Sequence, residues 1–186
     1  TGTLLVGTAQ GILELPGGNG RVRVGAKPDS TRGELYFNAP LTLGDGETVL
    51  FAIQPTGGIT RNSMGVLSLK TNEITRTSLA LMHPLAYVDG TLVYVTANGA
   101  LTAVGFDLRN RVATGDPIGL GPSVLVRVAG LSDAAMSPTG TLVYQSANAE
   151  SVVGWVNPRG EFTPVINDTK PYAYPRLSPD GSRIAV

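Results

Sequence analysis

The sequence predicts an all-β fold built from repeated units of four antiparallel strands. Three observations lead to this prediction. Short apolar and β-branched segments alternate with turns, a turn glycine returns every 41–50 residues, and no window of 11 or more residues shows a convincing 3.6-residue apolar period. The 24 glycines and 13 prolines make up about a fifth of the 186 residues, which is typical of many short strands joined by turns.

The repeat is anchored on the turn glycine. Five glycines, separated by 44, 44, 50 and 41 residues, are each followed by an apolar segment: Gly2, Gly46, Gly90, Gly140 and Gly181. The five copies read TGTLLV at 1–6, DGETVLF at 45–51, DGTLVYV at 89–95, TGTLVYQ at 139–145 and DGSRIAV at 180–186. In the last copy Pro179 presets φ, Asp180 can bond its own backbone, and Gly181 takes a positive φ. A period of this length indicates a solenoid, a propeller or an array.

Each period holds four predicted strands. The first has segments 3–7, 11–15, 21–24 and 35–43, and the second has 48–53, 66–70, 73–78 and 85–88. The third has 91–96, 101–108, 117–120 and 131–137, with an Asn98-Gly99 hairpin between the first two and a polar connection over 109–115. The fourth has 141–146, 152–156, 161–166 and 172–178. Four antiparallel strands in 41–50 residues predict the blade of a β-propeller.

The segment after each turn glycine is almost continuously apolar, as in Val49-Leu50-Phe51 and Leu92-Val93-Tyr94-Val95. Strands covered on both faces have this composition, and the blades of a propeller pack face to face. Tyr94 and Tyr144 occupy the same repeat position. We interpret both as packing residues whose hydroxyl groups reach a blade edge.

Several motifs resemble the WD40-like (PD40-type) repeat of TolB-like propellers. Ser178-Pro179-Asp180-Gly181, preceded by Pro-Arg-Leu and followed by Arg-Ile-Ala-Val, carries the resemblance, and residues 137–144 and 87–90 are variants of it. Segments 104–108, 113–117 and 154–160 are also similar, although Asn157 and Pro158 depart from the usual turn. The WD40 signature itself is missing, because Trp155 is followed by valine.

The resemblance covers essentially the whole chain, and its motif order is similar to the propellers of bacterial receptor-like serine/threonine kinases. It implies a propeller of about six blades in the bacterial cell envelope, periplasmic or extracytoplasmic. Four periods and part of a fifth lead us to expect one partial β-propeller domain over 1–186, as a section of a longer protein. The alternative is that its ends pair with another copy of the chain.

Composition and charge exclude several function classes. Lysine plus arginine equals aspartate plus glutamate at 14 each, and we expect the pairs Arg21/Arg23 and Arg109/Arg111 to form solvated faces, so no nucleic-acid partner is predicted. The chain has no cysteine, which excludes disulfides, thiolate metal sites and cysteine nucleophiles. No apolar run approaches the roughly 20 residues of a membrane span, so no membrane segment is predicted.

The residues that bear chemistry are few. His83 is the only histidine, and a structural role is favoured over a general base or a ligand facing the channel. Asp45, Asp89 and Asp180 share one repeat position and are predicted to cap turns. Segment 17–20 is glycine-rich but lacks a following helix, so it predicts a hairpin turn and no phosphate loop. Residues 167–169 match a glycosylation acceptor, a pattern short enough to occur by chance.

The sequence therefore predicts a non-catalytic protein-interaction or sensing module, with no catalytic, cofactor-binding or metal-binding residue assigned and no cofactor expected. A protein or peptide ligand is expected at a propeller face or in the central channel, with loops 54–63, 119–130 and 147–151 as candidate surfaces. The alternative is a substrate-gating propeller of a prolyl-oligopeptidase-type serine peptidase, whose G-x-S-x-G elbow would lie in another segment. A kinase-associated parent would likewise carry its kinase motifs outside these residues.

Overall fold

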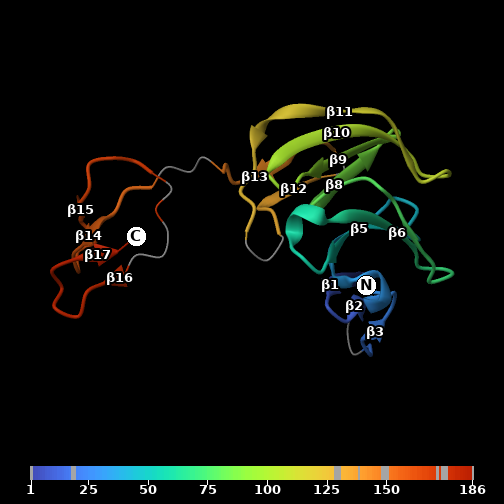
Figure 1. Ribbon diagram of the computed structural model, residues 1–186, viewed down its shortest axis with the longest axis horizontal. Helices are drawn as coiled ribbons and strands as arrows, with labels where there is room; N and C mark the ends of the chain where they lie inside the picture. Colours follow the sequence, from blue (N-terminus) through green and yellow to red (C-terminus); the bar gives the residue numbers. More distant parts are fainter. Residues whose placement is uncertain are drawn as a thin grey trace. The chain divides into compact units, whose positions relative to one another are not determined.

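The computed structural model describes residues 2–17, 20–127, 131–137, 139–147, 151–170, 172 and 176–185, and these residues form an all-β chain (Figure 1). Two single-turn 3-10 helices are present, η1 (Ser30–Arg32) and η2 (Ile59–Arg61). The strands are β1 (Thr3–Thr8), β2 (Gly11–Pro16), β3 (Arg23–Val24), β4 (Glu34–Thr42), β5 (Thr48–Pro55), β6 (Ser63–Ser68), β7 (Ile74–Arg76), β8 (His83–Val88), β9 (Thr91–Val95), β10 (Ala100–Asp107), β11 (Val112–Ser123), β12 (Ala134–Met136), β13 (Leu142–Tyr144), β14 (Gly154–Val156), β15 (Phe162–Pro164), β16 (Arg176–Leu177) and β17 (Ile184–Ala185).

The chain forms two compact units, Thr1–Gln145 and Ser146–Val186. The first unit contains β1–β13, and the second contains the hairpins β14–β15 and β16–β17. A single propeller domain over 1–186 stays a prediction.

The sheets of the first unit are antiparallel and follow the chain. Their strand orders are β1-β2-β3, β4-β5-β6-β7, β8-β9-β10-β11 and β12-β13. The predicted all-β class is therefore confirmed, and two of the sheets have four strands. Each sheet combines strands of two predicted periods, however, because the turn at the repeat glycine pairs 35–43 with 48–53 in one sheet and 85–88 with 91–96 in the other. The described sheets do not form a closed ring.

Four of the five turn glycines lie between paired strands: Gly46 between β4 and β5, Gly90 between β8 and β9, Gly140 between β12 and β13, and Gly181 between β16 and β17. Gly2 precedes β1. Gly46, Gly90, Gly140 and Gly181 all have positive φ, between 68° and 89°. The Oδ1 atom of Asp45 accepts hydrogen bonds from the amides of Glu47 and Thr48, both at 2.9 Å. Asp180 accepts from the amide of Ser182 at 3.1 Å in the same way. Turn capping is thus confirmed at these two aspartates.

Asp89 differs from the other two aspartates. Its own backbone is left-handed, with φ at 48°, and its carboxylate accepts no side-chain hydrogen bond from the described residues. Asparagine and aspartate tolerate this conformation better than most residues do. Asp89 therefore serves the turn through its backbone conformation.

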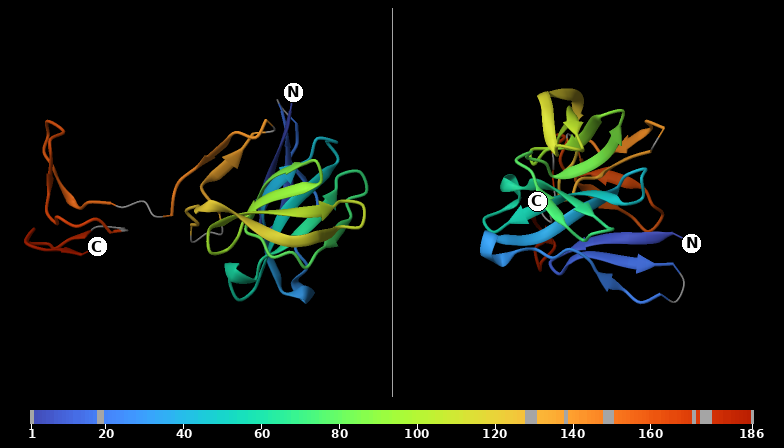
Figure 2. Two further views of the ribbon diagram at one scale, coloured as in Figure 1. Left: turned by 90° about the horizontal axis from the view of Figure 1, so that it is seen from above. Right: turned by 90° about the vertical axis from the view of Figure 1, so that its right-hand side faces the viewer.

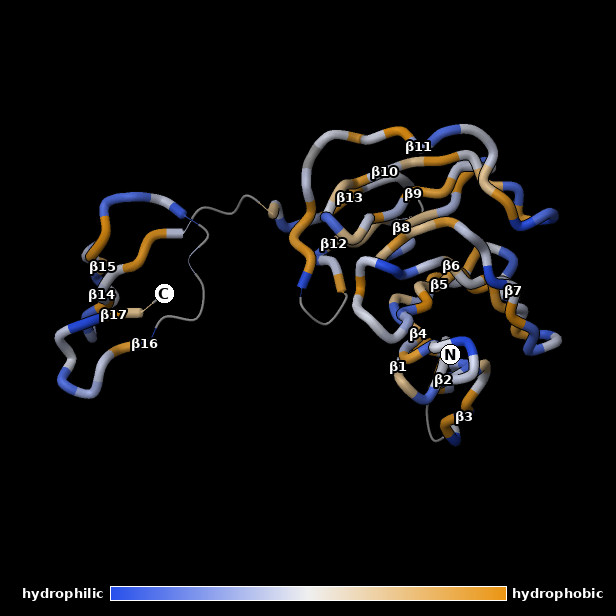
Figure 3. The backbone as a smooth tube through the Cα atoms, viewed as in Figure 1, coloured by the Kyte–Doolittle hydropathy of each residue, from blue (hydrophilic) through white to orange (hydrophobic). Residues whose placement is uncertain are grey.

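The best-buried strand is β5. Val49, Phe51 and Ile53 pack on the face toward the β1–β3 sheet, and Leu50 and Ala52 pack on the face toward β8–β11. All five are at most 3% exposed. Figure 2 and Figure 3 show these neighbouring sheets and the hydrophobic residues along their strands. The prediction of a strand buried on both faces is confirmed here, and each of its large apolar side chains stabilises the fold by about 1.5–3 kcal/mol.

Burial decreases away from the two four-stranded sheets. Tyr94 on β9 is 2% exposed and packs in the core, as predicted, whereas Tyr144 on β13 is 40% exposed. Leu4 on β1 is 62% exposed and Val143 is 69% exposed. The equivalent repeat positions are apolar in all these strands, but only the sheets with neighbours on both faces bury them.

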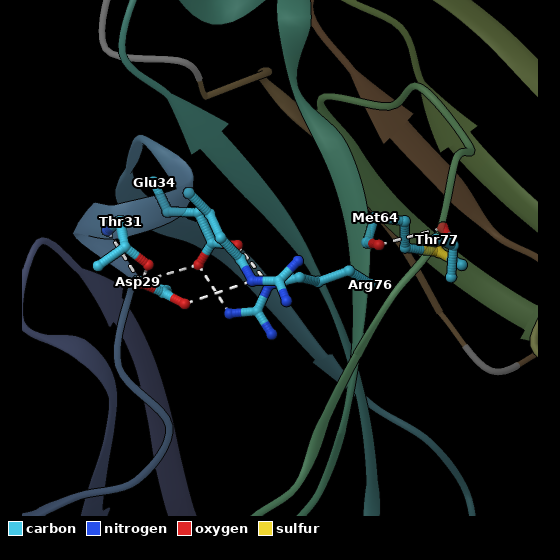
Figure 4. A network of polar contacts seen from close by, with 7 residues as sticks. Asp29, Thr31, Glu34, Met64, Arg76 and Thr77 are labelled. Atoms are coloured by element: carbon cyan, nitrogen blue, oxygen red, sulfur yellow. Dashed lines mark hydrogen bonds and ion pairs between the residues drawn. The ribbon is translucent and has the colours of Figure 1, made fainter.

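An ion pair closes one end of the β4–β7 sheet (Figure 4). Glu34 on β4 accepts from both the Nε and the Nη2 of Arg76 on β7, the latter at 2.9 Å, and from the amide of Asp29 at 2.8 Å. Burial opposes ionisation of Glu34, but these hydrogen bonds outweigh it and hold the pKa of Glu34 below its ordinary value.

The third period differs from the sequence prediction. Residues 109–115 were expected as a polar connection and 117–120 as a short outer strand, but β11 runs from Val112 to Ser123. Irregular pairing with β10 accommodates the extra residues: Gly105 pairs with Thr114, whereas Ala103 pairs with Ile118. Gly115, with φ at 89°, lies in the bulge.

Candidate functional site

A cavity of about 630 Å³ lies beside β1 and β4. The described residues that line it include no acidic or basic side chain: Leu5, Val6, Gly7, Thr8, Ala9, Tyr36, Asn38, Ala39, Pro40, Gln54 and Leu131. The lining therefore offers apolar contacts, hydroxyl groups and side-chain amides. Ligand sites commonly have this composition, a mostly apolar wall with a few polar groups that fix orientation.

Gly7 sets the distance between β1 and β4. A Cβ atom at Gly7 would lie 2.3 Å from the carbonyl oxygen of Phe37, which is backbone and cannot move aside cheaply. The sequence thus permits a close backbone approach here that any larger residue would prevent. This approach places the cavity wall formed by β1 directly against β4.

A strained bulge forms the β4 wall. Asn38 pairs with Ala52 and Leu41 pairs with Leu50, so β4 carries one more residue than β5 between these pairs. Ala39 in this bulge has φ at 50°, a left-handed conformation that costs an alanine roughly 1–2 kcal/mol. Bulges are common next to functional sites, where they redirect side chains.

Two amide side chains meet at the bulge. The Nδ2 of Asn38 donates to the Oε1 of Gln54 at 3.0 Å, and Asn38 is 9% exposed. The Oδ1 of Asn38 and the Nε2 of Gln54 make no other hydrogen bond with the described residues. The pair therefore holds one acceptor and one amide donor ready for a ligand, beside the half-exposed ring of Tyr36.

His83 makes a structural contact. Its Nδ1 lies 2.8 Å from the Oγ of Ser132, which is 7% exposed. Burial lowers the pKa of His83, and a hydrogen bond with the backbone of Ser132 only partly offsets this effect. A catalytic serine needs access to substrate and a histidine oriented by a carboxylate. Ser132 is buried, and the neighbouring Asp133 is held by Arg127, so this pair does not provide a nucleophile.

The remaining candidates do not gather into a chemical site. Among the described residues, no three of the histidine, aspartate and glutamate side chains are close enough to hold a metal ion. Asp45 and Asp180 are used by their own turns. Asn157, which departs from the family motif, accepts from the amides of Arg159 and Glu161 and so serves its turn as well.

The predicted surface loops are shorter than expected. Residues 54–55 belong to β5, 59–61 form η2 and 63 begins β6, and only Gln54 of this segment lines the cavity. Residues 119–123 belong to β11. Residues 128–130 and 148–150, in the second and third predicted loops, lie outside the described residues.

Sequence reasoning missed the Asn38–Pro40 bulge, which lay within the predicted strand 35–43. The available signal was Pro40, because proline inside a strand marks an edge or a bulge. Two smaller cavities are present: one of about 440 Å³ where β4, β8 and β12 approach each other, and one of about 430 Å³ within the second unit.

Comparison with family models, with curated proteins and with solved structures finds no match for this chain. Within the described part of the chain, no helix is both long and apolar enough to cross a membrane.

Proposed function

We propose that this chain contributes blades of a TolB-like, WD40-like β-propeller. Two four-stranded meanders follow each other along the chain and pack face to face, as blades do. The first strands of successive sheets are also neighbours, since β4 contacts β8 and β8 contacts β12. This arrangement supports a radial order with these strands nearest to the axis.

The proposed function is the non-catalytic binding of a protein or peptide ligand. The observation that carries it is the cavity beside β4, where the strained bulge at Ala39 presents the remaining acceptor of Asn38 and the remaining donor of Gln54. Peptide backbone groups are uncharged donors and acceptors that match such amides, and the apolar wall suits small side chains. The receptor-kinase resemblance supports a role in sensing at the bacterial cell envelope, with any enzymatic activity in another segment.

Selection from a displayed random-peptide library tests this proposal. The 186-residue chain is used as bait in parallel with Gln54→Leu, which keeps the side-chain size but removes the amide. Gln10→Leu, an exposed position in the β1–β2 turn, is the matched control. The proposal predicts one enriched motif, and the corresponding synthetic peptide binds the parent chain and Gln10→Leu saturably and binds Gln54→Leu about tenfold more weakly.

Two results would contradict the proposal. The first is that no motif is enriched, and the second is that the enriched peptide binds Gln54→Leu as tightly as it binds the parent chain. Circular dichroism of the variants, with spectra equal to that of the parent, ensures that the comparison concerns binding.

A further inference from the structure

A second cavity, of about 690 Å³, lies between the last strands of the two four-stranded sheets, β7 and β11. It is lined by Thr75, Arg76, Thr77, Ser78, Leu79, Ala80, Tyr94, Asn110, Arg111, Val112, Ala113 and Pro117. Among the described residues of this lining are two arginines and no acidic residue. It lies beside the edge strands β7 and β11, and it shares no described lining residue with the β1–β4 cavity.

Tyr94 supplies a hydroxyl donor at this cavity, on a side chain that is otherwise buried. Its side chain is 2% exposed and packs in the core between the two sheets, and the residue lines the cavity. Its hydroxyl makes no hydrogen bond with any described residue. The hydroxyl is not itself sealed from solvent, so this donor is available to a ligand that enters the cavity. Burial raises the pKa of Tyr94, which keeps the hydroxyl protonated at neutral pH.

Arg111 is unusual for its position. Left-handed residues occur in the turns before several returning strands, among them Asn72 in the β6–β7 turn, Arg111 directly before β11 and Gly160 in the β14–β15 turn. Asparagine and glycine are the residues that ordinarily adopt this conformation, and arginine is not. Residues held in strained backbone conformations cluster at ligand-binding and active sites.

The guanidinium of Arg111 faces the neighbouring sheet. Its Nη1 donates to the Oγ1 of Thr75 on β7, and no described carboxylate forms an ion pair with it. Arg76, by contrast, is held by Glu34. The carboxylate nearest to the hairpin, Asp107, accepts from Asn110 and from the amides of its own turn. Arg111 therefore leaves a positive charge in the cavity wall that no acidic side chain neutralises.

We propose that the β7–β11 cavity binds a small organic oxyanion, a carboxylate or a phosphate monoester with an apolar body. The Tyr94 hydroxyl and the Arg111 guanidinium donate to the oxyanion, since charge-assisted hydrogen bonds from arginine are the stronger kind in proteins. Leu79, Val112 and Pro117 contact the apolar body. This site is separate from the proposed peptide-binding cavity, and neither proposal depends on the other.

Titrations of the ¹⁵N-labelled 186-residue chain with benzoate and with phenyl phosphate, in an anion-poor buffer, test this site. Benzyl alcohol is the uncharged probe of the same shape. We expect saturable shifts of amide signals in β7, β9 and the β10–β11 turn with at least one of the two anions, and no saturation with benzyl alcohol. The stronger anion identifies the carboxylate or the phosphate as the preferred group.

Two variants are matched to their positions. Arg111→Asn removes the guanidinium and installs the residue that Asn72 already places at the equivalent turn, and Tyr94→Phe removes only the hydroxyl. Each is expected to weaken anion binding about tenfold, whereas Arg109→Gln, in the same turn, leaves it unchanged. The proposal is overturned if neither anion binds saturably at millimolar concentration, or if Tyr94→Phe and Arg111→Asn bind the anion as the parent chain does.

Discussion

Gly65 on β6 faces the ring of Phe51 on β5, and adding one methyl group there tests the packing of the core. A Cβ atom at Gly65 would lie 2.3 Å from the Cζ of Phe51 and 2.7 Å from each Cε atom. Phe51 is fully buried, and its ring packs on that of Phe37 with centroids 4.7 Å apart. The ring therefore has no free volume into which it can move.

The size of the effect follows from these distances. Carbon atoms in contact lie about 3.5–4.0 Å apart, so Gly65→Ala requires the ring or the strand to move by roughly 1.2 Å. Overpacking of this kind costs about 1–3 kcal/mol, and the lower entropy of the unfolded alanine chain recovers about 0.4–1 kcal/mol. We expect a net loss of about 1–2 kcal/mol in the free energy of unfolding.

Urea unfolding followed by far-ultraviolet circular dichroism measures this loss, since the only tryptophan, Trp155, belongs to the second unit. Gly44→Ala is the control, because a Cβ atom there has no neighbour within 4 Å and the backbone φ is not positive. Combining Gly65→Ala with Phe51→Leu should remove at least about 1 kcal/mol of the penalty. Equal stability of the two alanine variants, or strict additivity with Phe51→Leu, would refute the packing argument.

Three further predictions concern charged groups. Glu34→Gln should lower the free energy of unfolding at pH 7 by about 2 kcal/mol in urea melts, against less than about 1 kcal/mol for the exposed control Arg32→Gln. Because folding lowers the pKa of Glu34, the stability that its carboxylate contributes is complete above pH 4.5, the ordinary pKa of glutamate, and is lost as the pH falls through the lower pKa of the folded state. If the parent chain loses no more stability than Glu34→Gln over this pH range, this reasoning is contradicted. The His83 pKa is also lowered, so stability should decline as the pH falls below 6.5, and His83→Gln should flatten that decline in thermal melts at stepped pH. Asp45→Ala removes the acceptor of two amides and should cost about 1 kcal/mol, while Asp89→Asn, which keeps a residue tolerant of positive φ, should stay within about 0.5 kcal/mol; similar losses at both sites would show that the side-chain bonds do not matter.

Local features of the fold were predictable because they depend on neighbours in sequence. A left-handed glycine preceded by an acceptor side chain makes the same turn wherever it occurs, which is why Gly46 and Gly181 behave as predicted. A continuous apolar run such as that of β5 requires cover on both faces. The length of β11 was not predictable, because its bulge depends on pairing with β10 and not on the residues of β11 alone.

The sequence by itself determined the repeat, the strand-forming segments, the turn chemistry and the absence of cysteine chemistry. Only the tertiary structure decided which polar groups meet. Asn38 and Gln54 are 16 residues apart, Arg111 and Thr75 are 36 apart, and Glu34 and Arg76 are 42 apart. The physical reason is that strand pairing and sheet packing bring these residues together through backbone hydrogen bonds and burial, and neither of these interactions leaves a signature at the residues themselves.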